Sequence, residues 1–288
     1  MSTSARHPKA SVIIAIYKDT EALHCILLGL TRQTEKDFEV IVAEDGDAKE
    51  VADYIANRAP KSLDLKHLSQ EDIGFRKTRS VNNGIAKAIA DYLIFIDGDC
   101  IPHSRFVEMH LHHAEPTRIC TARRVYLGPK ESTKIRKQPE LAAKLENRLG
   151  LFLRFIPLHL DNVRDYEVGF HGSFLHNLAK NRQLGIMGCN FSCYKADMLK
   201  INGYNEDLPG IGGEDDDLEW RFNGLGMFTK NIKFQAVTYH LYHDSRRQDT
   251  EVNLSISRKN REKGIYRCLN GIIKETGSFA SASSAGKN

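Results

Sequence analysis

Short apolar runs alternate with amphipathic segments over the first hundred residues. Four of these runs have the length and composition of buried strands: 11–16, 38–43, 63–68 and 92–96. Between the runs, apolar residues recur every three or four positions, as in 23–30 and 77–91, which is typical of helices with one apolar face. Strands that alternate with helices in this way predict a wound, mainly parallel α/β sheet covered by helices on both faces.

The pattern is less regular beyond residue 100. We expect a short helix near 106–111, one strand over 118–127, a polar loop over 130–137 and a helix over 140–155. Regular patterning returns with a strand at 186–194, a short helix at 196–201, a helix from 218 and a strand at 234–239. These elements predict one domain over 1–275, made of a first half (10–127), a helical insert (128–184), a second half (185–245) and a basic C-terminal helix (246–275). The small, polar residues 276–288 predict a disordered tail.

The amino-acid composition limits the class of protein and the partners that it can have. The 288 residues are 41% apolar and 27% charged, which is typical of a soluble globular domain, and a net charge of +4 does not favour general nucleic-acid binding. No apolar run has membrane-spanning length, and no secretory signal is apparent. Six cysteines without CxxC spacing predict buried free thiols in a reducing cytoplasm. The basic, partly amphipathic segments 128–184 and 246–267 leave peripheral contact with the inner face of the plasma membrane as an alternative to packing on the sheet.

Carboxylates follow two of the predicted strands. Asp97-Gly98-Asp99 ends the run at 92–96, and Asp45 ends the run at 38–43. Because parallel strands end at one edge of a sheet, these acids are expected to share one crevice there. Paired aspartates repel each other unless a cation compensates, and Mg²⁺ is typically held by one or two carboxylates together with substrate phosphates. The alternative is a polar turn after a buried strand.

A second acidic cluster, Glu214-Asp215-Asp216-Asp217, follows a glycine-rich loop and starts a predicted helix. Acids in a first helical turn are favourable electrostatically, but four exceed what capping needs, so a general base is predicted here. His240 and His243 follow the strand at 234–239. They could complete an oxygen and nitrogen set for Mn²⁺ or Mg²⁺, or they could be surface loop residues.

Five motifs in order carry a family resemblance. They are Ser11 to Tyr17, Val42 to Gly46, Asn82 to Ile85, Ile96 to Asp99 and Gly212 to Asp216. Together they resemble the inverting glycosyltransferases of family 2, which have a GT-A fold, over residues 10–245. The segment 202–217 also resembles the carboxy-terminal part of β-1,4-galactosyltransferases and of bacterial chondroitin-type polymerases.

The resemblance implies roles by position. The first half would hold the nucleotide-sugar through Ala15, Tyr17, Asp45, Arg76, Asn82, Asp97 and Gly98. The metal would bind Asp99, Asp97, His243 and His240. The second half would supply Asp215 as general base with Glu214 beside it, and acceptor contacts from Asp216, Asn190 and Gly213. Where family members often carry arginine, this chain has Val81, which leaves Arg76 or Arg79 as the phosphate-side cation.

The resulting prediction is a metal-dependent inverting hexosyltransferase. It would move a hexose or N-acetylhexosamine from a UDP-sugar to a saccharide or lipid-linked saccharide of a surface glycan, with Mn²⁺ or Mg²⁺ as cofactor. One metal and one base, with no second nucleophile, imply a single displacement and hence inversion. The rivals are a nucleotidyltransferase acting on a sugar phosphate and a non-catalytic saccharide-binding module.

Overall fold

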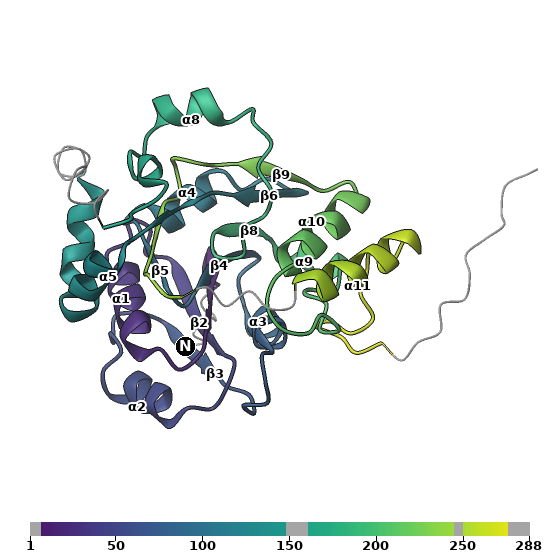
Figure 1. The fold of residues 1–288 in the computed structure, drawn as a ribbon, viewed down its shortest axis with the longest axis horizontal. Helices are drawn as coiled ribbons and strands as arrows, with labels where there is room; N and C mark the ends of the chain where they lie inside the picture. The colour runs from purple at the N-terminus through teal and green to yellow at the C-terminus, as the bar shows by residue number, and fades with distance from the viewer. Residues whose placement is uncertain (1–6, 148–160, 245–249, 276–288) are drawn as a thin grey trace, which may run out of the picture.

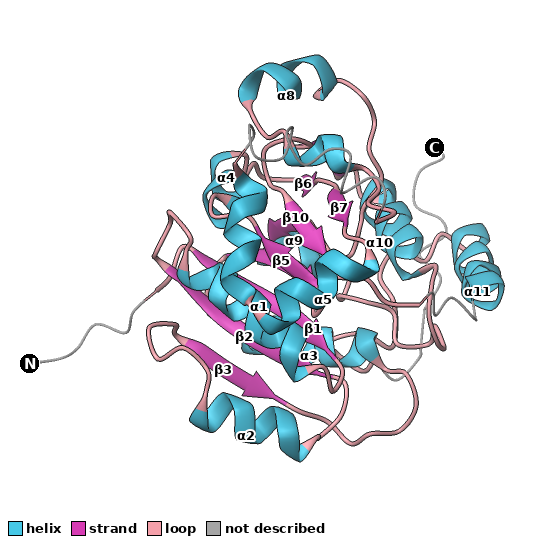
Figure 2. Cartoon of the chain, turned by 60° about the vertical axis from the view of Figure 1, so that its left-hand side comes forward, coloured by secondary structure: helices cyan, strands magenta, loops and turns pink. Residues whose placement is uncertain are grey.

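The computed structural model describes residues 7–147, 161–244 and 250–275. Its centre is a seven-stranded sheet in the order β3-β2-β1-β4-β8-β6-β9 (Figures 1 and 2). The strands are β1 (Ala10–Ile16), β2 (Phe38–Glu44), β3 (Leu65–Leu68), β4 (Tyr92–Asp97), β6 (Arg118–Thr121), β8 (Phe191–Tyr194) and β9 (Phe228–Asn231). The first four in the order pair in parallel, and β8 runs antiparallel to both of its neighbours. The predicted mixed, mainly parallel sheet is confirmed.

A second sheet of three short strands lies beside the end of β4. It consists of β5 (Cys100–Pro102), β10 (Thr238–His240) and β7 (Arg124–Tyr126), in the order β5-β10-β7. Because β10 pairs antiparallel with β5, His240 lies opposite Cys100, one residue after Asp99. This small sheet therefore joins two segments about 140 positions apart in the sequence.

Helices cover both faces of the large sheet (Figure 2). They are α1 (Thr20–Thr31), α2 (Lys49–Asn57), α3 (Lys77–Lys87), α4 (Phe106–His112), α5 (Pro129–Lys137), η1 (Pro139–Glu146), η2 (Tyr166–Gly169), α8 (Ser173–Ala179), α9 (Lys195–Lys200), α10 (Glu214–Gly224) and α11 (Thr250–Glu262). Among the described residues, no helix is both long and apolar enough to cross a bilayer.

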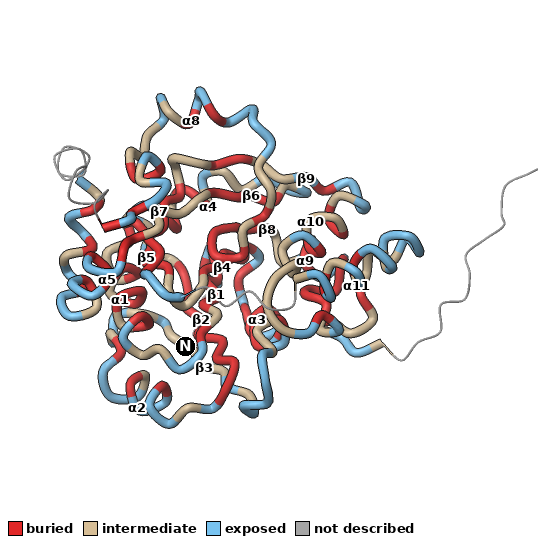
Figure 3. Tube along the Cα trace, in the orientation of Figure 1, coloured by how far each residue is buried: buried red, intermediate tan, exposed pale blue. Residues whose placement is uncertain are grey.

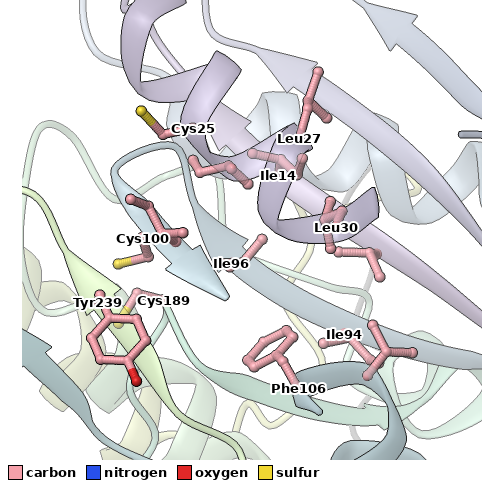
Figure 4. Packing of buried hydrophobic residues seen from close by; sticks show 14 of the residues in the cluster. Ile14, Cys25, Leu27, Leu30, Ile94, Ile96, Cys100, Phe106, Cys189 and Tyr239 are labelled. Atoms are coloured by element: carbon pink, nitrogen blue, oxygen red, sulfur yellow. The ribbon is translucent and has the colours of Figure 1, made fainter. Parts of the chain in front are cut away.

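The core follows from the alternation of side chains along the strands. Ile14 and Ile96 face the side covered by α1, where Leu27 packs (Figure 4). Their neighbours Ile13 and Phe95 face the opposite side, which α3, α9 and α10 cover. The strands at the centre are buried on both faces (Figure 3), which is why they appear in the sequence as continuous apolar runs.

Several boundaries differ from the sequence prediction. Residues 118–127 are two strands in two sheets, because the chain leaves the large sheet after Thr121 and enters the small one at Arg124. The predicted loop at 130–137 is wrong: the segment is helix α5, which begins with proline at its first turn and buries Ile135. A single apolar residue in such a helix leaves no periodicity to detect.

Other strands and helices are shorter than predicted. Of the predicted strand at 186–194, only Phe191–Tyr194 pairs in a sheet. The strand predicted at 234–239 is shorter and begins later, as Thr238–His240. The predicted helix at 140–155 starts as the 3₁₀ helix η1, and its remainder from 148 lies outside the described residues. The helix expected over 246–275 is present as α11 and ends at Glu262. The tail at 276–288 also lies outside the described residues.

Candidate active site

The turn between β4 and β5 places two carboxylates against the end of β1. The Gly98 amide donates to the carbonyl oxygen of Ala15 at 2.7 Å. A Cβ atom on residue 98 would lie 2.7 Å from that same oxygen, so only glycine allows β1 and β4 to come this close. Ala15 and Gly98, both predicted to contact the nucleotide, therefore meet through their backbones.

Asp99 lies between two histidines. Its Oδ2 atom is 3.4 Å from Nε2 of His240 and 3.2 Å from Nε2 of His243. Burial alone would raise the pKa of Asp99, but hydrogen bonds from both imidazoles outweigh it and hold that pKa well below its usual range. A carboxylate oxygen with two imidazole nitrogens is an oxygen and nitrogen set that suits Mn²⁺ or Mg²⁺.

Cys100 belongs to the same cluster. Its Sγ lies within 4.8 Å of ligand atoms of Asp99 and His240, which makes these three a possible metal group. The thiol donates to Oδ1 of Asp99 at 3.3 Å, and burial raises its pKa well above the usual value. Because a thiolate is the metal-binding form, Cys100 acts here as a hydrogen-bond donor that orients Asp99.

Asp97 makes a different contact from Asp99. Its Oδ1 accepts from Nζ of Lys77 at 2.6 Å, and its Oδ2 is 4.0 Å from the Arg124 guanidinium. Lys77 was not predicted as a site residue. It is the first residue of α3, whose first turn has no acid, and a cation at a helix N-terminus is electrostatically unfavourable. A lysine at the start of a predicted helix was therefore the feature of the sequence that could have indicated a role for Lys77.

Asp45 accepts hydrogen bonds from the loop that leads into α3. It is 4% exposed, its Oδ2 accepts from the backbone amide of Arg76 at 2.7 Å, and its Oδ1 accepts from Nε2 of Gln70 at 2.8 Å. The Arg76 guanidinium donates to the carbonyl of Glu71. Tyr17, which directly follows β1, is 44% exposed. Tyr17 and Asp45 thus follow the neighbouring strands β1 and β2, and Asp97 ends β4 on the other side of β1.

Asp215 is the second residue of α10 and is close enough to Lys77 to interact with it electrostatically. The N-terminal glycines Gly212 and Gly213 have φ values of 101° and 85°, which turn the chain into the helix. Oδ2 of Asp215 accepts from the amide of Gly188 at 2.8 Å. Burial raises the pKa of Asp215 to about 7, with Glu214 and Asp97 adding to the rise while Lys77 and the Gly188 amide oppose it. A carboxylate with a pKa near neutrality is suited to general base catalysis.

The four consecutive acids have four different surroundings. Glu214 lies beside Asp215, and its Oε2 is buried without a hydrogen-bond partner in the described part of the chain. Asp216 is exposed. Asp217 is fully buried, where it accepts from Nε of Arg221 at 2.8 Å and from the Ser257 hydroxyl at 3.0 Å. Asp217 therefore anchors α11 to α10, and only Glu214 and Asp215 face the Lys77 side.

Two predicted contact residues are part of the scaffold. Asn190 is fully buried, its amide donates to Ala236 at 3.0 Å and its Oδ1 lies 3.1 Å from the His110 ring. Asn82 is 2% exposed, and its amide donates to the Tyr204 carbonyl while its Oδ1 accepts from the Tyr204 amide. With these polar atoms already satisfied inside the protein, Asn190 is not a candidate for acceptor contact and Asn82 is not one for phosphate contact.

Comparison with protein families decides the relationship. The family model described as "Glycosyl transferase family 2" matches residues 11–175, which includes β1, Asp45, Lys77 and Asp99. The chain belongs to glycosyl transferase family 2. A second model, described as "N-terminal domain of galactosyltransferase", matches residues 170–244, which includes Asp215 and both histidines.

Curated relatives of this family 2 chain are longer than it is. It is 30% identical to validoxylamine A glucosyltransferase from Streptomyces hygroscopicus subsp. jinggangensis over 76% of this chain and 52% of the relative. It is 24% identical to chondroitin synthase from Escherichia coli over 84% of this chain and 36% of that protein. The chain thus spans about half of the first relative and about a third of the second.

A solved structure extends the likeness to the fold. GalNAc-T7, solved with UDP, GalNAc and Mn²⁺, superposes with a TM-score of 0.60 at 12% identity, over 88% of this chain and 48% of that one. The GT-A fold predicted from the sequence is confirmed. In this family 2 chain, Lys77 contacts Asp97 at the end of β4 and is close enough to Glu214 and Asp215 at the start of α10 to interact with both.

Proposed function

We propose that this chain transfers a sugar from a UDP-sugar to a hydroxyl of a saccharide acceptor, with inversion at the anomeric carbon. The observation that carries the proposal is the pairing of Asp215, with a pKa of about 7, with the Asp97 and Asp99 turn on the other side of Lys77. A transferase of this type needs a donor side that tolerates a diphosphate and one carboxylate that removes the acceptor proton. The two sides lie on different halves of the chain.

The residues around Asp99 fit a divalent cation. Asp99, His240 and His243 offer one oxygen and two nitrogens, and Cys100 fixes the orientation of the carboxylate. Bound there, Mn²⁺ or Mg²⁺ would supply positive charge that neutralises the diphosphate leaving group. The solved relative of the same fold that holds UDP and Mn²⁺ supports this choice of nucleotide and metal.

Asp215 would accept the proton of the attacking hydroxyl, and Glu214 would help to place the sugar next to it. Lys77 forms an ion pair with Asp97 and tempers the rise in the pKa of Asp215. Exposed Asp216 and the loop at Gly213 lie where an acceptor would approach the start of α10. Because one base acts without a second nucleophile, the displacement is single.

A surface glycan or its lipid-linked precursor is the proposed acceptor. The likeness to chondroitin synthase supports a saccharide acceptor. We also propose a cytoplasmic location, which the six free, buried cysteines support.

The test is a UDP-release assay over a panel of UDP-sugars, with Mn²⁺, Mg²⁺ or chelator, and with oligosaccharide acceptors. UDP release that needs both metal and acceptor is the expected result, and product stereochemistry by NMR checks inversion. Release of pyrophosphate from UTP and a sugar phosphate would instead show a nucleotidyltransferase. Saccharide binding without turnover of any UDP-sugar would show a binding module.

A further inference from the structure

Helix α8 presents its large apolar side chains to solvent. Phe174 is 76% exposed and Leu178 is 66% exposed, and their spacing of four residues places them on one face of the helix. The buried positions on α8 are His176 and Ala179, so a polar residue and a small residue face the protein body. This is the reverse of the usual arrangement for a surface helix. Figure 1 shows α8 projecting at the top of the molecule, and Figure 3 shows that most of its residues are exposed.

Hydrogen bonds hold α8 in this orientation. The Gly172 amide donates to the Phe234 carbonyl at 2.8 Å just before the helix. Nδ1 of His176 lies 3.2 Å from the Lys233 carbonyl oxygen. At the end of the helix, the side-chain Nδ2 of Asn231 donates to the Ala179 carbonyl at 2.9 Å. The outward placement of Phe174 and Leu178 is therefore fixed at both ends of the helix.

A basic hollow of about 650 Å³ lies next to the C-terminal end of α8. The charged residues that line it are Arg118, Lys180, Arg182, Lys230 and Glu115. Glu115 lies 3.0 Å from Nζ of Lys230 and 3.8 Å from the Arg118 guanidinium, so the four cations exceed the single carboxylate. Lys180 and Arg182 are exposed. The apolar face and the cations are thus adjacent in sequence as well as in space.

We propose that α8 and this basic hollow form a docking surface for an anionic phospholipid bilayer. Two protruding apolar side chains can enter the boundary between headgroups and acyl chains, while the lysines and arginines beside them attract anionic headgroups. Phe174 and Leu178 protrude from the surface and do not line the hollow, so they form no apolar groove of the kind that would receive a protein segment. The charge surplus complements anionic lipid, which favours the bilayer.

This surface lies at the far end of the helix that carries the proposed base. The hollow includes Asn223, near the end of α10, and Asp215 lies at its start. A helix of this length spans about 16 Å. A lipid-linked acceptor on the docked bilayer could therefore reach Asp215 with its saccharide. Vesicle binding is measured without donor or acceptor, so its outcome does not depend on the proposed transfer reaction.

Sedimentation with vesicles tests the proposal. The full chain is mixed with vesicles of phosphatidylcholine alone or with added phosphatidylglycerol, and the bound fraction is measured at low and high salt. Binding is expected only with phosphatidylglycerol and should fall as salt screens the charges. In the K180E/R182E variant, binding should weaken by about fivefold or more for each replaced cation. The F174S/L178S variant should also bind more weakly.

The matched controls make the same kinds of substitution at positions away from α8. K49E/K61E changes two lysines on and just after α2, at the opposite end of the molecule, and I89S/I273S replaces two exposed isoleucines. Both should bind like the unchanged chain. Equal binding to the two vesicle types, or equal losses in the control and α8 variants, overturns the proposal. Sedimentation velocity without lipid gives a third readout: if F174S/L178S abolishes a dimer, a second copy covers α8 and the bilayer assignment is wrong.

Discussion

Nζ of Lys77 lies 2.6 Å from Oδ1 of Asp97, so the first residue of α3 neutralises the last residue of β4. The same ammonium is close enough to Glu214 and Asp215 for both acids to raise its pKa against the effect of burial. One lysine thus connects the proposed donor side with the proposed base. Changing it should affect both sides.

Lys77→Met should move the acidic limb of the pH–rate profile to higher pH. Lys77 lowers the pKa of Asp215, so its removal lets burial and the neighbouring acids raise that pKa further. At a pH below the new pKa, the rate should fall about tenfold for each unit of the shift. The measurement is kcat against pH at saturating donor. Lys77→Arg keeps the charge and should retain most of the profile; an unchanged profile in Lys77→Met would rule out this coupling.

Asp215→Asn should lower kcat by about 10²- to 10⁴-fold, because the variant has no carboxylate to take the proton of the attacking hydroxyl. UDP affinity should change little, since Asp215 is bonded to Gly188 and not to the residues around Asp99. The rate of the unchanged chain should rise with pH up to about 7, where Asp215 becomes ionised. Asp53→Asn, at an exposed aspartate on α2, is the matched control. Comparable losses in both variants would contradict the assignment of the base to Asp215.

The same carboxylate should make stability depend on pH. The pKa of Asp215 is raised to about 7 in the folded chain, so between about 3.9 and 7 the folded state holds more protons than the unfolded state. Its contribution to stability is therefore present at low pH and is lost as pH rises, by at most about 1.4 kcal/mol per pH unit. Asp215→Asn removes this loss. In thermal unfolding, the stability of the variant relative to the unchanged chain should be higher at pH 8 than at pH 5. An equal stability difference at both pH values would contradict the raised pKa.

Removal of the histidines should weaken metal-dependent nucleotide binding. His240→Ala and His243→Ala each delete a nitrogen within 3.4 Å of the same Asp99 oxygen, and Asp99→Asn deletes its charge. We expect losses in Mn²⁺ affinity of about 10- to 100-fold or more. Calorimetric titration of UDP with Mn²⁺, repeated with chelator, measures them. His112→Ala, an exposed histidine on α4, is the control and should bind normally; the metal site is misplaced if its effect matches that of His243→Ala.

Asp217 should matter for folding and not directly for chemistry. It is paired with Arg221 in a fully buried contact, and the Arg221 guanidinium also donates to the carbonyls of Ile201 and Gly203. Arg221→Met leaves Asp217 as an unpaired buried charge, so unfolding by denaturant should show a loss of about 3–5 kcal/mol. Asp216→Asn should leave stability within about 0.5 kcal/mol. A small effect of Arg221→Met would mean that water reaches Asp217.

The sheet could be predicted because its strands are buried on both faces. Four apolar runs marked β1 to β4 within two residues, and the acids after β2 and β4 marked the functional edge. The insert could not be predicted in this way. Helix α5 has one fully apolar core contact, Ile135, and is held by contacts such as the bidentate pair of Arg136 with Asp19, which no local pattern reveals.

Some residues of the candidate site could be predicted from the sequence, and others could not. Asp99, His240 and His243 come together as expected, because strand ends define where they lie. Lys77 was missed, since its role depends on a contact 20 residues away in the sequence. Asn82 and Asn190 were placed at the site by family resemblance, yet the side chains of both form hydrogen bonds to groups far along the chain. Burial of a polar side chain is a tertiary property and leaves no mark in one sequence.

The pairing of β4 with β8 has a consequence for biosynthesis. Tyr92 on β4 lies opposite Tyr194 on β8, and the two strands close the centre of the sheet. While the ribosome makes the residues between them, β4 is an apolar edge strand without its outer partner, which is a template for aggregation. At bacterial or eukaryotic elongation rates of about 5–20 residues per second, that interval is on the order of 5–20 s. The turn that carries Asp97 and Asp99 is therefore made early, and the strand before it stays an open edge until the second half of the chain emerges.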